Sequence, residues 1–244
     1  MQIIPPILRT VRPEANWLFL ISLALLIFKL FVLNQYTEIF NGAYELGLIF
    51  EAILVSVLAS YIFYFFVVHI KEYSDRLHTK PYIQKHALLP VGDCVRQLFE
   101  FARIVNTPMP LEKIDEVLIS SAFQKIDPYS NAPLILGPSN LHANWFQYFD
   151  YHRNRTRESI SRVFSQLIYV DAELISILSA IDECSHFSHL NMFLNSQVSN
   201  QNMLAWVSDF TSYCELCQQL NDCCEKTFGE SVKYESHSLY PINC

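Results

Sequence analysis

The chain has 244 residues, with 17 Lys or Arg against 24 Asp or Glu, so its net charge is −7 at pH 7. Since ordinary domains take about 100 to 200 residues, this length allows one globular domain and a short membrane segment. Only 5 glycines occur, which argues against a glycine-rich phosphate loop and favours helices. After residue 85 the chain has 10 basic against 18 acidic residues, and this acidic field disfavours non-specific nucleic-acid binding.

Two long apolar segments precede residue 71. The first spans 15–33 with Lys29 as its one charge, and the second spans 46–70 with Glu51 as its one charge. Each can cross a hydrocarbon core of ~30 Å, because about 20 helical residues suffice. A cleaved signal peptide is the alternative for the first segment, but no small-residue cleavage motif follows it and a second span comes next. The sequence therefore predicts a transmembrane hairpin over 15–70.

The flanking charges predict how the hairpin is oriented. The connecting segment 34–45 has no Lys or Arg, whereas basic residues flank the other end of each span: Arg9, Arg12, Lys71, Arg76, Lys80 and Lys85. Positively charged flanks stay on the cytoplasmic side of a membrane. We therefore expect a two-span protein of the bacterial inner membrane, with residues 1–14 and the C-terminus in the cytoplasm.

The two charges in the apolar segments fall at a similar predicted depth. Lys29 and Glu51 lie about 6 and 7.5 Å below the outer ends of their helices, at 1.5 Å per residue. An unpaired charge in the core costs at least ~2.5 to 3.5 kcal/mol, so a mutual ion pair is predicted. In the alternative, Lys29 extends to the outer headgroups and Glu51 is protonated. In the hypothesis we prefer, the pair locks the hairpin or joins neighbouring chains.

Small residues recur every four positions in the second segment, at Ala52, Ser56 and Ser60. Such a strip lets another helix backbone come close in lipid. It predicts packing either against the first span of the same chain or against a second copy.

The rest of the chain predicts helices. Residues 71–90 are expected to form a basic linker, 93–105 and 111–126 helices, and 127–140, with its three prolines, a loop before a helix capped by Ser139 or Asn140. Apolar residues at intervals of 3 and 4 then indicate two long amphipathic helices, over about 160–181 and 203–229. The predicted fold class is all-α, a transmembrane hairpin with a cytoplasmic multi-helix bundle over 91–229 and a tail over 230–244.

The chain has seven cysteines, several of them in the second long helix. A zinc site is the more specific of two interpretations of these cysteines. Cys214 and Cys217 form a CxxC motif, and Cys184, His186 and His189 form a second cluster of possible ligands. An antiparallel hairpin turning near Met192 would separate the two clusters by about 14 residues, or roughly 21 Å. We therefore expect no metal and no cofactor, and treat the cysteines as small core residues.

An arginine-rich stretch follows a run of aromatic residues. Arg153, Arg155, Arg157 and the nearby Arg162 are candidates for contact with a protein or with nucleic acid. The competing interpretation is a solvated helix face. No recognised catalytic motif occurs, so an enzyme is not expected.

The predicted architecture resembles the membrane effectors of bacterial antiphage systems. The resemblance lies in two spans with a very short loop, a helical cytoplasmic domain and the span ending SYIFYFFVVHIK (60–71). The likeness is greatest to the two-span effectors that accompany retrons. It implies a non-enzymatic toxic effector whose cytoplasmic domain holds the spans inactive, by contact with a reverse transcriptase and its nucleic acid, until release damages the inner membrane. The alternative is a membrane-tethered adaptor or scaffold that recruits a soluble partner and has no toxic output.

The orientation can be tested with reporter fusions. Because basic flanks remain on the cytoplasmic side, fusions at both termini should report the cytoplasm, and one at Asn41 should report the exterior. Alkaline phosphatase and green fluorescent protein fusions make the measurement. An external C-terminus would contradict the predicted topology.

Overall fold

The computed structural model describes residues 13–35, 42–137, 141–194 and 199–233. The chain divides into two compact units, Met1–His78 and Thr79–Cys244.

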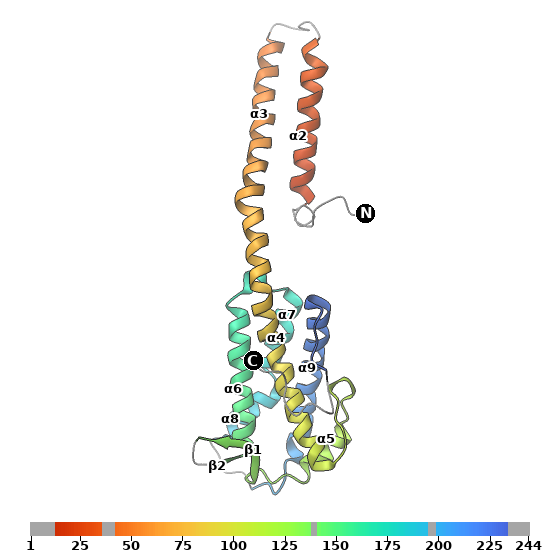
Figure 1. Ribbon diagram of the computed structural model, residues 1–244, viewed down its shortest axis with the longest axis vertical. Coiled ribbons are helices and arrows are strands. Elements are labelled where there is room, and N and C mark those ends of the chain that lie inside the picture. Colours follow the sequence, from red (N-terminus) through yellow and green to blue (C-terminus); the bar gives the residue numbers. More distant parts are fainter. Residues whose placement is uncertain (1–12, 36–41, 138–140, 195–198, 234–244) are drawn as a thin grey trace. The chain divides into compact units, whose positions relative to one another are not determined.

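The first unit is a helical hairpin followed by further helix. Helix α2 lies beside α3 (Figure 1). Both are long and apolar enough to cross a membrane, in agreement with the two predicted spans. The elements are α2 (Pro13–Phe31), the 3-10 turn η1 (Leu33–Gln35), α3 (Ala43–Phe63), the π-helical turn η2 (Tyr64–His69) and the start of α4 (Ile70–Val105).

The hairpin buries few side chains, a lysine among them, and exposes most of its large apolar ones. In α2 the buried side chains are Ser22 and Lys29, and in α3 the buried side chain is Leu54. Large apolar side chains are exposed on both helices, among them Trp17, Leu18, Phe28, Leu46, Phe50, Ile53 and Phe63. Only 11% of the most apolar stretch of each helix is buried, whereas a core helix of a water-soluble domain would be mostly buried.

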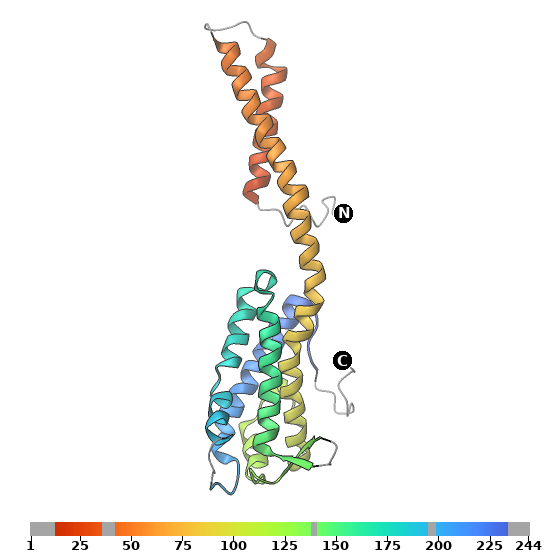
Figure 2. The same ribbon diagram turned by 90° about the vertical axis from the view of Figure 1, so that its left-hand side faces the viewer.

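The second unit is a helical bundle, as predicted. Helices α4, α6, α7 and α9 run side by side, and α5 lies with a two-stranded ribbon at one end (Figures 1 and 2). Its elements after α4 are η3 (Leu111–Lys113), α5 (Glu116–Phe123), β1 (Asn131–Leu136), β2 (Leu141–Asn144), α6 (Trp145–Phe164), η4 (Leu167–Tyr169), α7 (Ala172–Asp182), α8 (Ser185–Leu194), η5 (Leu204–Trp206) and α9 (Val207–Phe228).

The segments between the spans and the long helices differ from the expectation in two places. Residues 71–90, expected to be a linker, are helical and belong to α4, which carries Pro81 and Pro90 in its interior. The helix expected over 111–126 is interrupted after η3, because Asp115 caps α5 by accepting hydrogen bonds from the amides of Val117 and Leu118.

The prediction of a loop over 127–140 is also wrong in part. It contains β1, which pairs antiparallel with β2 and brings Ile135 opposite His142. The cap of α6 is Asn144 rather than Ser139 or Asn140, which lie outside the described residues. Asn144 and Gln147 form a reciprocal capping box, each side chain bonding the other's backbone N–H at 2.9 Å.

The long helix expected over 160–181 is split into α6 and α7. After Phe164, the Ser165 hydroxyl donates to the Arg162 carbonyl at 2.7 Å, a local bond that competes with helix continuation. The expected turn near Met192 is wrong as well, since Met192 lies within α8. By contrast, α9 ends at Gly229, whose positive φ of 80° suits the left-handed helix cap predicted there.

An aromatic cluster fills the core of the second unit. The Phe101 ring of α4 lies 5.0 Å from Phe123, 5.2 Å from Phe210, 5.7 Å from Trp145 and 6.1 Å from Phe149, centroid to centroid. Such pairs contribute about 0.5–1.5 kcal/mol each beyond their buried area. One ring of α4 therefore ties together α5, α6 and α9.

A proline in α4 creates a specific bond to α6. Pro90 has no N–H, so the carbonyl of His86, four residues earlier, loses its helical donor. The Ser159 hydroxyl of α6 donates to that carbonyl at 2.7 Å. Both residues are buried, so water cannot reach this carbonyl. The serine hydroxyl therefore supplies the hydrogen bond that the carbonyl would otherwise lack.

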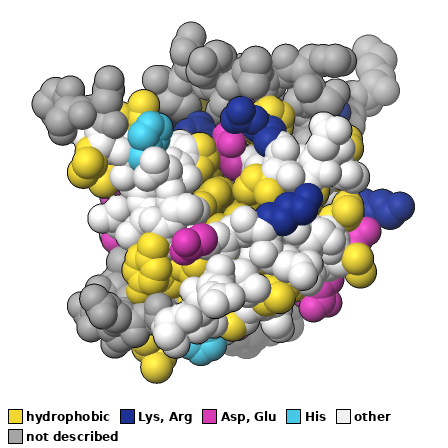
Figure 3. Space-filling model, turned by 90° about the horizontal axis from the view of Figure 1, so that it is seen from below, with side chains coloured by type: hydrophobic (Ala, Val, Ile, Leu, Met, Phe, Trp, Pro, Cys, Tyr) yellow, Lys and Arg dark blue, Asp and Glu magenta, His cyan; other side chains and the backbone are white. Residues whose placement is uncertain are grey.

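One end of the second unit carries exposed apolar side chains. Figure 3 shows apolar side chains gathered among Lys and Arg on the face seen from below. Val117, Tyr129, Ile135 and Leu141, which belong to α5, the ribbon and the segment between them, are all exposed. The surface of the bundle is therefore partly apolar at this end.

The bond between Ser159 and His86 can be tested by a double-mutant cycle. Ser159→Ala should lower the free energy of unfolding by about 1–3 kcal/mol, because a buried carbonyl loses its donor. In a Pro90→Ala background the cost should be smaller, since an alanine at this position supplies the missing N–H. Denaturant unfolding of the full chain in detergent, followed by tryptophan fluorescence, gives the values. Exposed Ser161→Ala is the control, and an equal cost in both backgrounds would refute the assignment.

Candidate functional site

The structure brings the two charges of the apolar segments together. The Lys29 ammonium of α2 contacts the Glu51 carboxylate of α3 as an ion pair. The Lys29 side chain is 8% exposed and that of Glu51 32% exposed. Gly47, one turn before Glu51, lies beside the Lys29 stem: a Cβ there would stand 3.7 Å from Lys29 Cε. The pair is thus held between the helices, with the carboxylate nearer the surface.

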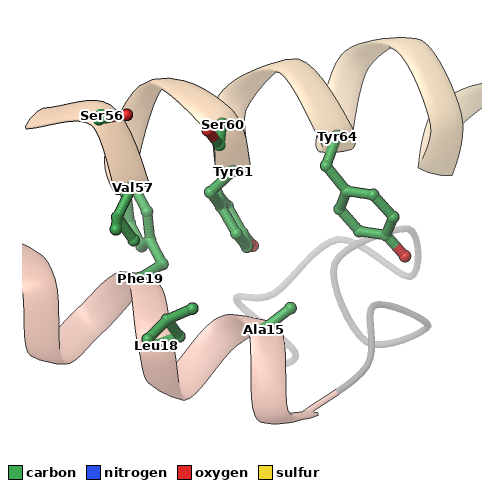
Figure 4. A pocket seen from close by; sticks show the side chains of 8 residues that line it. All are labelled: Ala15, Leu18, Phe19, Ser56, Val57, Ser60, Tyr61 and Tyr64. Atoms are coloured by element: carbon green, nitrogen blue, oxygen red, sulfur yellow. The ribbon is translucent and has the colours of Figure 1, made fainter. Parts of the chain in front are cut away.

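A groove lies between the two helices, apart from the ion pair. It holds about 310 Å³ and contains two serine hydroxyls in an otherwise mostly apolar lining (Figure 4). The Tyr61 hydroxyl donates to Asn16 Oδ1 at 2.5 Å, and the Tyr61 ring stacks on Phe19 at 4.5 Å. The lining residues are Ala15, Leu18, Phe19, Ser56, Val57, Ser60, Tyr61 and Tyr64.

The small-residue strip stays exposed although α2 lies beside part of it. Ala52 and Ser60 are exposed, and Ser56 is exposed too, although the two serines also line the groove. The more buried positions of the same stretch are Leu54 and Val57. The strip therefore leaves space for a further helix to approach α3 closely.

The four candidate arginines are engaged within their own chain. Arg162 pairs with Glu158 at 2.6 Å on the exposed face of α6. Arg157 donates to the Asp182 carboxylate at 2.8 Å and to its carbonyl at 3.1 Å, which joins α6 to the end of α7.

The other two arginines are tied to buried partners. Arg153 is nearly buried, pairs with Asp150 and donates to the Phe187 carbonyl of α8 at 3.3 Å. Arg155 Nε lies 3.4 Å from Asp93 Oδ2 of α4. Three of the four arginines thus hold α6 against α4, α7 and α8, and a ligand would have to compete with these contacts.

Asp93 was missed as a candidate from the sequence. It is 1% exposed, and its Oδ1 lies 3.4 Å from Nδ1 of the buried His152. The carboxylate is therefore shared by His152 and Arg155, two positions of α6 that lie almost one turn apart. The signal in the sequence is the spacing of His152 and Arg155, since residues three apart on a helix share a face and can contact the same group. Nothing in the sequence around Asp93 indicates that it is their partner.

The cysteines lie in the core of the bundle. Cys94, Cys214 and Cys217 are fully buried, and the sulfurs of Cys94 and Cys214 are 3.5 Å apart. Burial raises the pKa of all three thiols, which keeps them protonated and weakens them as nucleophiles and metal ligands.

The second cluster that we considered for zinc is also dispersed. Cys184 and His186 are buried, whereas His189 is exposed and its Nδ1 lies 2.5 Å from Asp209 Oδ2. Within the described ranges, no group of three or more His, Cys, Asp or Glu side chains is arranged to hold a metal ion.

His186 lies inside the aromatic core. Its ring stacks on Tyr213 at 5.3 Å and meets Phe149 edge-on at 5.2 Å. Burial is the main cause that lowers the pKa of His186 to about 3, and the nearby charges of Arg153 and His189 lower it further against the opposing effect of Asp209. The imidazole is therefore neutral at physiological pH.

Comparison of the chain with protein-family models, with curated proteins and with solved structures found no match.

The buried imidazole predicts a pH dependence of stability. Below pH ~6.5 the unfolded chain binds a proton at His186 that the folded chain refuses until about pH 3, so acid favours unfolding. The free energy of unfolding should fall by up to about 1.4 kcal/mol per pH unit from this residue. The measurement is denaturant unfolding of the full chain at several pH values between 7 and 4. His186→Phe should remove the contribution of this residue to the pH dependence of the free energy of unfolding. Exposed His142→Phe should retain it, and equal slopes for His186→Phe and the parent would exclude this role.

Proposed function

We propose that the chain is a non-enzymatic effector of the bacterial inner membrane, of the antiphage type that its architecture resembles. The observation that carries the membrane assignment is the polarity of the hairpin. It buries Lys29 and Ser22 and exposes its apolar side chains, which is stable in lipid and unfavourable in water. Both termini of the hairpin would face the cytoplasm, as the basic flanks predict.

The ion pair supports a role for the hairpin as a device that can change state. Lys29 and Glu51 neutralise each other within one chain, while the strip of Ala52, Ser56 and Ser60 stays exposed. Two copies that approach through this strip would bring four charged groups close together in the membrane. Exchange of partners between copies could then open a polar path across the lipid, which is the damage expected of such an effector.

The helical unit would supply the control. In the proposal it holds the spans inactive while a partner, such as a reverse transcriptase with its nucleic acid, is bound, and it releases them when the partner is altered. The paired arginines of α6 offer a route for this control, because an anionic ligand that captured Arg157 would free Asp182 at the end of α7.

Inducible expression with a membrane-potential dye tests this function. Expression of the full chain without its partner should depolarise the cells, and a chain that ends at His78 should depolarise them at least as strongly. If the full chain is found in the membrane and the potential stays normal in both cases, the effector assignment fails. The adaptor then becomes the better explanation, and co-purified soluble proteins would identify its partner.

The charge pair yields a separate prediction. Lys29→Leu and Glu51→Leu should each reduce depolarisation, because each leaves one charge unpaired at a cost of at least ~2.5 to 3.5 kcal/mol. The exchanged double variant, Lys29→Glu with Glu51→Lys, should recover part of it. Glu45→Leu, an exposed carboxylate at the start of α3, is the matched control and should have no effect. If the exchange is no better than the weaker single variant, the pair is not functional.

A further inference from the structure

The chain turns back along the bundle after α9. Gly229 ends the helix with a positive φ of 80°, and residues 230–233 that follow are neither helix nor strand. We call residues 230–233 the strap, which returns beside the helices (Figure 2). The Val232 side chain packs against the core, whereas Glu230 and Lys233 are exposed. The strap is therefore attached to the bundle near its middle.

One side chain of α9 binds the backbone of the strap. The Asn221 amide donates to the Val232 carbonyl at 3.2 Å, and the Asn221 Oδ1 accepts from the Val232 N–H at 2.8 Å. An extended residue directs its N–H and its carbonyl to the same side, so these two bonds reproduce the contact that a neighbouring β-strand makes. Asn221 thus binds one extended peptide unit.

The lengths of the helix end and of the strap match. Asn221 lies seven residues before Phe228, which is about 10.5 Å along the helix axis. Val232 lies three residues after Gly229, and an extended chain covers about 10 Å over that interval. The strap therefore lies alongside the last two turns of α9.

The packing of the helices does not account for Asn221. The residue is 7% exposed, and Cys217 and Cys224, one turn before and after it on α9, are buried as well. Among the described residues, the hydrogen bonds of its side chain go to Val232 alone. A buried amide without partners is costly, so an aliphatic residue would suit this face of α9 better. The asparagine is explained by the peptide unit that it binds.

Helix α4 completes the site from the other side of the strap. Gln84 Nε2 donates to the Glu230 carboxylate, and Lys80 Nζ lies 5.8 Å from the centre of the Phe228 ring. The site thus combines an amide for extended backbone, a place for one aliphatic side chain and a donor for a carboxylate two residues earlier. In peptide recognition of this kind, main-chain bonds supply affinity and side-chain contacts supply specificity.

We propose that Asn221 and Gln84 form a peptide-binding site that the chain's own strap occupies at rest. The partner that takes it over is a protein with an extended segment that carries an aliphatic residue two positions after a carboxylate. Such a segment makes the same contacts, because the site holds the backbone of the strap and only one of its apolar side chains. The site lies wholly within the second unit, so it does not depend on what the hairpin does.

Photo-cross-linking of a peptide to the full chain in detergent tests this proposal. The probe is the acetylated and amidated peptide GESVK, residues 229–233, with a diazirine-bearing leucine in place of its valine. The strap competes with it at an effective concentration on the order of millimolar, as expected for a short tether. Val232→Pro removes the N–H that Asn221 accepts and so displaces the strap without altering α9. A scrambled peptide of the same composition is the control.

The Val232→Pro chain should be cross-linked at α9 several-fold more than the parent, as mass spectrometry of the digested protein measures. Adding Asn221→Leu should abolish that gain, because leucine fills the same space without an amide. If the folded Val232→Pro chain is labelled no more than the parent or than the double variant, or equally by the scrambled peptide, the proposal is overturned.

Gln84→Ala in the Val232→Pro background gives an independent check that leaves α9 intact. It should lower labelling by the probe several-fold, because the peptide carboxylate loses its donor. It should leave labelling unchanged for a probe with alanine in place of the glutamate, since that probe makes no such contact. An equal loss with both probes would refute recognition of the carboxylate by Gln84.

Discussion

An ammonium group and a carboxylate within an apolar helical hairpin are stabilised when each neutralises the other. Lys29 and Glu51 meet this requirement, and their pairing sets which faces of α2 and α3 turn inward. With both charges directed inward, large apolar side chains are left on the outside of the hairpin, a surface that is stable in lipid and unfavourable in water. The exposed apolar surface of the hairpin and the inward position of its charges are therefore two aspects of one constraint.

The second unit obeys the opposite rule, since its apolar residues are inside. Phe101 contacts four other rings in the core, and several of the polar residues that the unit buries contact one another between α4 and α6. Pro90 frees one carbonyl for Ser159, and Asp93 draws His152 and Arg155 toward α4. Buried polar groups are costly when unpaired, so these contacts favour one alignment of the two helices over others.

The chain joins an apolar helical hairpin to a helical bundle with its own core. In the proposed function the hairpin acts on the membrane and the bundle decides when. The pairing of Arg157 with Asp182 and the exposed η4 turn both lie toward the last part of α6 and the segments that follow it. In the proposed function, a partner bound there would alter the packing of α6 against α7, which gives the control a physical path that does not require catalysis.

The sequence by itself determined the features that depend on local composition and periodicity. Two runs of about 20 apolar residues, each with one charge, were enough to predict the hairpin and the meeting of Lys29 with Glu51, because helix geometry converts sequence position into depth. The helical class of the rest and the end of α9 at Gly229 followed from periodicity and capping. Only the tertiary structure decided the break after Phe164, the β1–β2 ribbon and the partners of the arginines. A continuous apolar repeat does not reveal where a serine bonds back to its own helix, and an arginine's partner on another helix depends on packing that neither sequence segment encodes alone.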